Sequence, residues 1–478
     1  MKYLLILTSL FIYSSIYAQQ PDNTGICNDT VAISSKTVFI KNPIELKYIQ
    51  PQERLIFIDD TFKNMKSAGY WISKLDNPDD IILSEKEIKE FNNRIFNTKV
   101  NITNLKDYPD TINTADFIKT LKTRLDYITK KQYFNENLRE IQKEYFDFLQ
   151  NSIDIDTNSQ NLQIKFAMTV KYSDIRILPT DDKIFSDPNN FDIDKLQEES
   201  LDLGVPLAVI CQTKNKKWSY VVAPLEEGWI KTENLAWTDK KTIIKWIDTK
   251  KIALITSTKA DIFLDEQMKN YFEYARMGSK FHLVKKIGKT KTCVTIPTAD
   301  TQGNLVLKKA YIPRENINIG FLQFTQRNIL TQAFKHLNSP YGWGGYNGEQ
   351  DCSSFIGQIF NCFGVILPET SFQKIKCGIL LTEFTNNQLP SQKEEFIINN
   401  ATAGLSLIYL PGHITLYVGN EKNKPYAIHA IWGVSAYDQN NQKTIKFINK
   451  VVVSDLDIGN DVAGNSLLDR IIKINLLR

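Results

Sequence analysis

The stretch that decides the fold of the C-terminal part of the chain runs from Tyr341 to Phe363 and reads YGWGGYNGEQDCSSFIGQIFNCF. A glycine-rich segment leads into Asp351 and Cys352, after which apolar residues recur at helical spacing. Asp351 is suited to cap a helix beginning at Cys352, because its side chain can accept hydrogen bonds from the free N–H groups of the first turn. A helix start also favours an anion, which predicts that the pKa of the Cys352 thiol is lowered from about 8.5. The pattern therefore predicts a reactive cysteine.

A cysteine nucleophile needs a proton carrier, and the chain contains only 4 histidines. His413 begins a predicted strand after a Pro-Gly pair, and His429 lies on the next predicted strand. Antiparallel neighbours can share one face, so His413 can act as base while His429 orients its ring. We interpret His282 and His336 as structural. A cysteine on a helix followed by histidines on strands predicts a papain-like α+β domain with a Cys-His-His triad.

We expect further domains in the remainder of the chain, because 478 residues exceed what one hydrophobic core usually organises. Residues 84–155 show apolar positions at helical spacing, which indicates helices that pack against something else. From residue 166 onward short β-like runs alternate with turns, which favours two tandem SH3-like barrels, although periodicity alone leaves one larger β domain open. We expect a multidomain α+β protein with a helical N-terminal region at 19–160, barrels at 161–240 and 241–315, and the catalytic domain at 316–478.

The start of the chain has the pattern of an export signal. Lys2, an apolar run and then Ala18 predict a secretory signal peptide at residues 1–18, and hence a periplasmic or secreted protein without stable membrane insertion after cleavage. The net charge of +4 gives no electrostatic case for nucleic acid. The 6 cysteines and the histidines lack metal-ligand spacing. We therefore expect no metal, no other cofactor and a monomer.

Five motifs in the C-terminal region carry a resemblance to a known family. They are Tyr341-Gly342-Trp343-Gly344-Gly345, Asp351-Cys352-Ser353-Ser354-Phe355, Leu367-Pro368, the run from Pro411 to Gly419, and the run from Ile428 to Gly433. In this order they resemble the NlpC family of cell-wall cysteine peptidases. The stretch from Tyr172 to Thr180 also resembles the first bacterial SH3-like domain of the multidomain members, which carry two such barrels and a helical N-terminal stabilising segment.

The resemblance implies a reaction and a substrate. Such an enzyme hydrolyses the bond between γ-D-glutamate and a diamino acid, either diaminopimelate or lysine, in peptidoglycan stem peptides with a free N-terminal L-alanine. Three residues fall on the family's triad positions, namely Cys352, His413 and His429. The reaction would serve cell-wall turnover or recycling.

The resemblance also implies roles for residues around the triad. The hydroxyl of Tyr341 would donate a hydrogen bond to the oxyanion, as would the backbone N–H of Cys352. Asp351 would receive the free amino group of the L-alanine, and Ser353 and Trp343 would contact the substrate. Glu369, after the Leu-Pro motif, departs from the basic residue expected in close relatives.

Other functions remain open on the sequence alone. A papain-like acyltransferase or amidase would use the same triad, and a requirement for a free amine would separate it from a peptidase. A non-catalytic peptidoglycan-binding protein would keep the barrels and lack activity. A toxin delivered against other bacteria is a third possibility, although the signal peptide points to the cell's own envelope.

Overall fold

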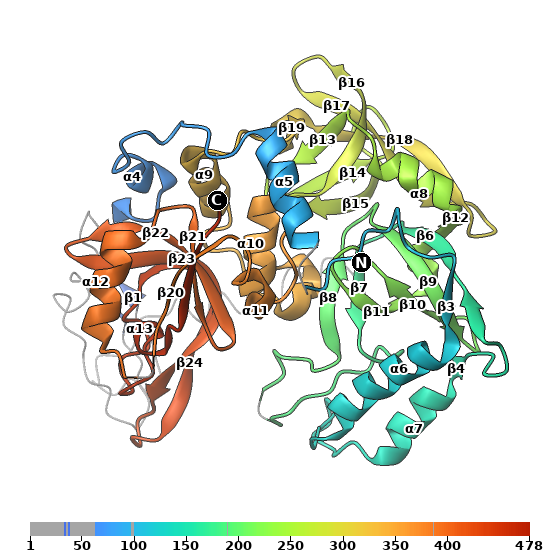
Figure 1. Cartoon of the computed structure of the whole chain (residues 1–478), viewed down its shortest axis with the longest axis horizontal. Helices are drawn as coiled ribbons and strands as arrows, with labels where there is room; N and C mark the ends of the chain where they lie inside the picture. The colour runs from blue at the N-terminus through green and yellow to red at the C-terminus, as the bar shows by residue number, and fades with distance from the viewer. Residues whose placement is uncertain (1–32, 35–36, 39–62, 97–99, 189, 386) are drawn as a thin grey trace, which may run out of the picture. The chain divides into compact units, whose positions relative to one another are not determined.

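The computed structural model describes residues 63–96, 100–188, 190–385 and 387–478, and the paired strands β1 (Ile33–Ser34) and β2 (Thr37–Val38) (Figure 1). The predicted signal peptide lies outside these residues. Within them, no helix is long and apolar enough to cross a membrane. Residues 66–478 form one unit, to which the following description applies.

The N-terminal part of this unit is mainly helical. Its elements are α4 (Ala68–Ile72), α5 (Glu85–Phe96), β3 (Thr111–Asn113), α6 (Thr114–Thr129), α7 (Lys143–Asn151) and β5 (Asn161–Gln163), with β3 and β5 paired. The predicted helical pattern does not continue between α6 and α7. Leu138 has a φ of 60° and is 57% exposed. The Asn135 side chain accepts hydrogen bonds from the N–H groups of Asn137 and Arg139, which closes a turn instead.

The first sheet follows directly. Its strands are β4 (Ile153–Asp154), β6 (Lys165–Thr169), β7 (Ser173–Arg176), β8 (Gln197–Leu201), β9 (Pro206–Thr213), β10 (Trp218–Val222), β11 (Glu227–Lys231) and β12 (Leu235–Thr238), with the 3-10 turn η1 (Thr232–Asn234) before β12. Their order is β12-β6-β9-β10-β11-β7-β8, with β4 paired to β9. Helix α6 packs on this sheet through Phe117, whose ring meets Tyr220 edge-on at 5.1 Å. Helix α6 thus packs against the core of the first sheet.

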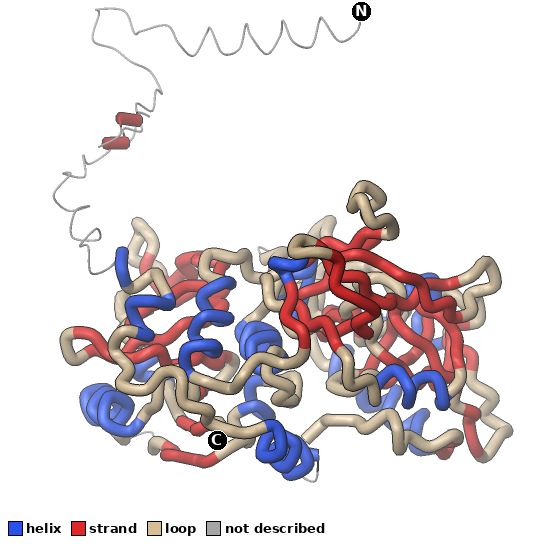
Figure 2. The backbone as a smooth tube through the Cα atoms, turned by 90° about the horizontal axis from the view of Figure 1, so that it is seen from above, coloured by secondary structure: helices blue, strands red, loops and turns tan. Residues whose placement is uncertain are grey.

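A second, separate sheet follows helix α8 (Lys240–Ile247). Its elements are β13 (Ile252–Ile255), β14 (Lys259–Phe263), β15 (Tyr271–Arg276), β16 (Lys280–Ile287), β17 (Lys291–Ala299), β18 (Leu305–Pro313), η2 (Arg314–Asn316) and β19 (Ile317–Ile319), in the order β15-β14-β18-β17-β16-β13-β19. Its core, around Phe281 and Val294, is distinct from that of the first sheet. Figure 2 shows the strands of both sheets in red.

The C-terminal domain places helices beside an antiparallel sheet. Its elements are α9 (Gln326–Lys335), η3 (Trp343–Gly348), α10 (Cys352–Asn361), α11 (Ser371–Lys374), β20 (Ile379–Glu383), α12 (Pro390–Asn400), β21 (Ser406–Leu410), β22 (His413–Glu421), β23 (Lys424–Tyr437), β24 (Lys443–Asp455), α13 (Leu467–Arg470) and β25 (Lys473–Leu476). The strand order is β20-β25-β21-β22-β23-β24. The predicted multidomain α+β fold class is confirmed. Strand β24 was not predicted, and β23 is longer than expected.

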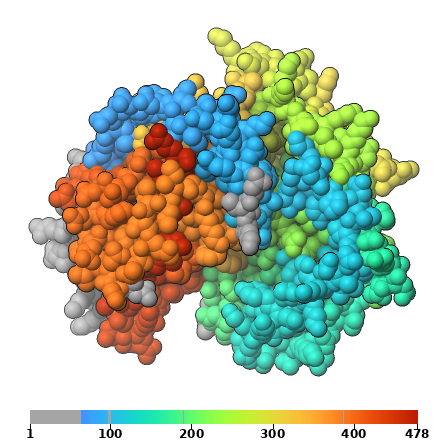
Figure 3. Space-filling view, in the orientation of Figure 1, coloured from blue at the N-terminus to red at the C-terminus, as the bar shows by residue number. Residues whose placement is uncertain are grey.

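The residues before the first sheet also contact the C-terminal domain. Trp71 of α4 is fully buried, and its ring lies 5.4 Å from that of Tyr426 on β23. Asn92 of α5 donates a hydrogen bond of 2.8 Å to the carbonyl of Gly364, just after α10. In Figure 3 this segment is blue and lies against the orange C-terminal domain. The N-terminal segment therefore holds both the nucleophile helix and the histidine strands.

Candidate functional site

Cys352 is the first residue of α10 and is 8% exposed. Asp351 caps this helix as predicted, because its Oδ1 accepts hydrogen bonds from the N–H groups of Ser353 at 2.8 Å and Ser354 at 2.9 Å. The N–H of Asp351 donates in return to the Ser354 hydroxyl at 2.9 Å. This reciprocal cap fixes the position of the thiol at the helix start.

The thiol itself differs from the prediction of a lowered pKa. Burial raises the pKa of Cys352 to about 12, and the negative charge of Asp351 adds to this. Hydrogen bonds from the backbone N–H of Ile414 and from Ser353 lower the pKa only in part. The prediction was wrong because desolvation outweighs the helix terminus in the free protein. The thiol is therefore protonated at neutral pH and must lose its proton during attack.

The two histidines of the neighbouring strands are joined by a hydrogen bond. His413 begins β22 and His429 lies within β23, and 2.8 Å separate Nε2 of His413 from Nδ1 of His429. Nε2 of His429 lies 3.0 Å from the hydroxyl of Ser454 on β24. Ser454 was missed in the sequence because β24 was not predicted.

Both imidazoles are neutral in the free protein. Burial lowers the pKa of His413 to about 3, with the charge of Arg470 adding to the effect. Burial and the neighbouring His413 hold the pKa of His429 well below its ordinary value. Because Cys352 meets the N–H of Ile414, the thiol lies at the start of β22, the strand whose first residue is His413.

Tyr341, Ser353 and Trp343 lie around the same helix start. Burial raises the pKa of Tyr341 well above its usual range, and the nearby charges of Asp351 and Cys352 raise it further. Ser353 is 8% exposed and touches the thiol. The indole N–H of Trp343 is buried and has no hydrogen-bond acceptor in the part of the chain that the structure describes.

The glycine-rich segment η3 forms the contact between the first sheet and the C-terminal domain. Gly345 has a φ of 76°, and a Cβ there would lie 1.8 Å from Oγ of Ser200 on β8. Gln197 of the same strand donates a hydrogen bond of 2.9 Å to the carbonyl of Gly344. Only glycine fits this backbone conformation and this close approach. The first sheet therefore lies directly against the segment that leads to the nucleophile.

Two further carboxyl groups lie close to Asp351. Glu199 of β8 is 5% exposed and accepts a hydrogen bond of 3.0 Å from the N–H of Ser200. Burial raises the pKa of Glu199 well above its usual range, and the charges of Glu369 and Asp351 and a hydrogen bond to Glu369 add to this. The carboxyl group of Glu199 therefore lies in an environment that disfavours its charged form. Sequence reasoning noted Glu369 only as a departure and missed Glu199, which lies in a different domain.

A buried cation lies under this acid group. Lys374 of α11 is fully buried, and its ammonium donates hydrogen bonds of 2.5 Å to the carbonyls of both Pro368 and Glu369. The ammonium lies 3.8 Å from Oε1 of Glu369. It also lowers the pKa of Asp351 in part, against the raising effect of burial. Lys374 thus holds the loop that carries Glu369.

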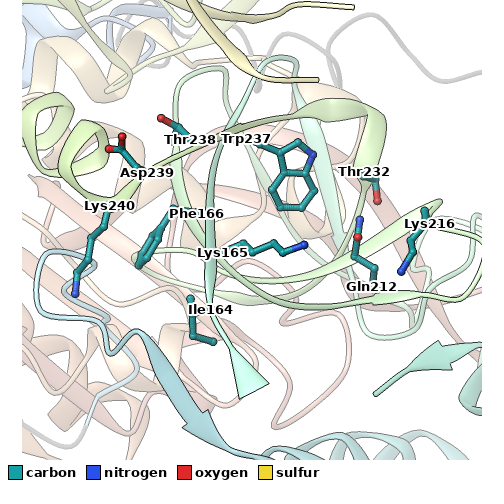
Figure 4. Close-up of a pocket in the computed structure, with 10 residues that line it drawn as sticks. All are labelled: Ile164, Lys165, Phe166, Gln212, Lys216, Thr232, Trp237, Thr238, Asp239 and Lys240. Atoms are coloured by element: carbon teal, nitrogen blue, oxygen red, sulfur yellow. The ribbon is translucent and has the colours of Figure 1, made fainter. Parts of the chain in front are cut away.

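The first sheet carries a separate surface pocket of about 750 Å³ (Figure 4). Its lining residues are Ile164, Lys165, Phe166, Gln212, Lys216, Thr232, Trp237, Thr238, Asp239 and Lys240. None of them belongs to the group around Cys352. Among the described residues, no three His, Cys, Asp or Glu side chains are placed to hold a metal ion.

Two family models match the chain. Residues 338–452 match the NlpC/P60 family, and residues 183–231 match the SH3 domain of the SH3b1 type. A curated protein, "Probable endopeptidase p60" of Listeria seeligeri, is 31% identical over 94 residues, which cover 19% of this chain and 16% of that protein. The matching part is thus a small fraction of that relative.

Solved structures are similar over a larger part. An NlpC/P60 endopeptidase from Photobacterium damselae subsp. piscicida aligns with a TM-score of 0.69 at 20% identity, covering 86% of this chain and 96% of that chain. An NlpC/P60 family protein from Bacillus cereus aligns with a TM-score of 0.43 at 16% identity, covering 65% of this chain and 98% of that one. The first similarity shows a common fold over most of the chain.

Proposed function

Given that residues 338–452 form an NlpC/P60 domain and residues 183–231 an SH3b1-type domain, we propose that the protein is a cysteine peptidase of peptidoglycan stem peptides. It cleaves between γ-D-glutamate and a diamino acid. The observation that carries the proposal is the buried thiol of Cys352 at the start of β22, the strand that begins with His413, together with the hydrogen bond between His413 and His429. Following the predicted signal peptide, we propose that it acts outside the cytoplasm.

The pair of imidazoles supports a defined proton path. When Nε2–H of His413 donates to Nδ1 of His429, Nδ1 of His413 is left with a lone pair. As Sγ of Cys352 attacks the scissile carbonyl carbon, this lone pair accepts the thiol proton. His429, held by Ser454, then stabilises the imidazolium. A neutral thiol and a neutral imidazole are the starting state that burial imposes.

The remaining steps return the proton. The carbonyl oxygen becomes an oxyanion, which accepts hydrogen bonds from the N–H of Cys352 and the hydroxyl of Tyr341. The raised pKa of Tyr341 keeps that hydroxyl protonated and therefore a donor. His413 gives its proton to the leaving amine as the C–N bond breaks, which leaves a thioester. Water, deprotonated by His413, then hydrolyses the thioester and restores the thiol.

The acid group supports the requirement for a free amine. Asp351, Glu199 and Glu369 share one buried region, and burial together with the neighbouring acidic groups raises the pKa of Asp351 and of Glu199. A buried carboxylate needs a compensating cation, which the ammonium of an N-terminal L-alanine supplies. Because Asp351 directly precedes Cys352, this ammonium fixes how far along the peptide the thiol can reach.

The test is mass spectrometry of L-Ala-γ-D-Glu-diaminopimelate and its lysine analogue after incubation with the purified protein. The matched controls are Cys352→Ala and the same peptides acetylated on the alanine. Release of L-Ala-γ-D-Glu only from free-amine peptides, and only with Cys352 present, is the expected result. Equal cleavage of acetylated peptide would remove the amine role from Asp351. Cleavage of neither would favour the acyltransferase or binding alternatives.

A further inference from the structure

Two lysines between strands β7 and β8 of the first sheet have their ammonium groups over aromatic rings of η3. The ammonium of Lys183 lies 4.7 Å from the ring centroid of Tyr346 and donates a hydrogen bond of 2.8 Å to its hydroxyl. The ammonium of Lys195 lies 5.2 Å from the ring centroid of Trp343. Both lysines come from the segment between β7 and β8, and both rings come from the segment before the nucleophile helix. Cation–π contacts therefore join the two domains at the site.

The two lysines differ in their partners. The ammonium of Lys183 donates a hydrogen bond to the Tyr346 hydroxyl and also lies 3.7 Å from a carboxylate oxygen of Glu136. Lys195 forms no ion pair within the part of the chain that the structure describes, and the adjacent Asp194 is taken by Arg176. Lys195 is half-buried, and burial lowers its pKa, with the charge of Lys131 adding to the effect. An anion at Lys195 would relieve this unfavourable environment.

The same indole offers a second donor. Within the described ranges, the buried Nε1–H of Trp343 has no acceptor, and the Lys195 ammonium over the same ring has no acidic partner. The next residue, Gly344, points its N–H toward Oδ2 of Asp351 at 3.4 Å. Trp343, whose ring lies under Lys195, and Gly344, whose N–H points toward Asp351, are therefore adjacent residues with Cα atoms about 3.8 Å apart.

A peptide held at this site brings both charges. If the proposed function holds, L-Ala-γ-D-Glu carries an ammonium and, a few bonds away, the free α-carboxylate of its glutamate. The acid group around Asp351 attracts the ammonium and repels the carboxylate, which needs a separate cation. Lys374 is engaged by two carbonyls, and Arg276 is engaged by Asp202 and Ser200.

We propose that Lys195, seated on Trp343, is a specificity-determining residue that binds the α-carboxylate of the γ-linked glutamate. It comes from the SH3b1-type domain, so that domain supplies a charge that selects the substrate. The inference rests on the proposed function and deepens it. The assignment predicts that Lys195 favours peptides whose glutamate has a free α-carboxylate. Peptides in which this carboxylate is amidated carry no negative charge for Lys195 to bind.

The test compares kcat and KM for L-Ala-γ-D-Glu-L-Lys and for the peptide with an α-amidated glutamate. Wild type, Lys195→Gln, Lys195→Arg and the matched control Lys183→Gln are measured. We expect wild type to prefer the free acid. Lys195→Gln should reduce kcat/KM for the acid about tenfold more than for the amide, mainly through KM, as loss of one charge-assisted hydrogen bond requires. Arginine should restore part of the preference, and Lys183→Gln should leave the ratio unchanged.

The possible failures are distinguishable. An equal loss on both peptides in Lys195→Gln would make the lysine a structural contact only and overturn the assignment. A wild-type preference for the amide would overturn it as well. If wild type cleaves neither peptide, the proposed function fails and this inference fails with it.

Discussion

Replacement of His429 tests whether this residue stabilises the positive charge that His413 acquires when it accepts the thiol proton. His429→Leu removes the acceptor that lies 2.8 Å from Nε2 of His413, while His429→Gln keeps a side-chain acceptor. A hydrogen bond to a charged group contributes about 1.5–3 kcal/mol, and about 1.4 kcal/mol corresponds to a tenfold change in rate. Because His413 is charged only during reaction, we expect kcat of the leucine variant to fall roughly tenfold to hundredfold, with a smaller fall for glutamine.

The assay measures kcat on L-Ala-γ-D-Glu-L-Lys at several pH values. Thermal unfolding is measured on the same preparations, because an unpaired N–H on the buried His413 ring also costs about 1–3 kcal/mol of stability. Activity is therefore compared at a temperature where both variants are folded. A leucine variant whose kcat stays within about twofold of wild type would refute the claim that His429 stabilises the imidazolium.

Three other perturbations follow from contacts described above or from buried groups nearby. Asp351→Asn keeps a capping side chain but removes the charge, so kcat/KM for free-amine peptide should fall about tenfold. Asp351→Ala should in addition lower the free energy of unfolding by about 1 kcal/mol, and equal stability of the two variants would contradict the capping role. Gly345→Ala should destabilise more than Gly412→Ala in denaturant unfolding, although both glycines have positive φ. A Cβ at Gly345 would lie 1.8 Å from Ser200, whereas a Cβ at Gly412 would meet no described residue within 4 Å. The His336 ring is fully buried, and its nitrogens have no hydrogen-bond partner among the residues that the structure describes. Burial lowers its pKa to about 3, so its contribution to stability is complete above about pH 6.5 and is lost as the pH falls toward 3. Between pH 7 and pH 5 the unfolding midpoint should therefore fall less in His336→Leu than in wild type. An equal fall in both proteins would show that other groups cause it.

The local part of the site could be predicted from the sequence. The cap at Asp351 depends on residues within one helical turn, and the pairing of His413 with His429 depends on two strands joined by a short turn. Patterns of this length carry their own geometry. The fold class followed for the same reason, because helical and strand periodicity can be read separately in successive short segments.

The rest of the site depends on contacts between distant segments. Glu199 and Lys195 reach the site from the first domain, and no spacing in the sequence relates them to Asp351 or Trp343. Ser454 lies on β24, whose first five residues are all exposed although they include Ile445 and Phe447, so this strand lacks the regular alternation of a half-buried strand. The pKa of Cys352 was predicted in the wrong direction because burial is a property of the packed domains and not of one helix.

The close seating of β8 on the glycine-rich segment has a consequence for how such proteins can diversify. A catalytic domain transferred alone to another protein would arrive with its thiol and imidazoles but without Glu199 and Lys195. Substitutions in the neighbouring domain, in contrast, could change which peptides are accepted while every reacting atom stays in place. Selection for new substrates can therefore act on one domain while the chemistry is inherited unchanged in the other.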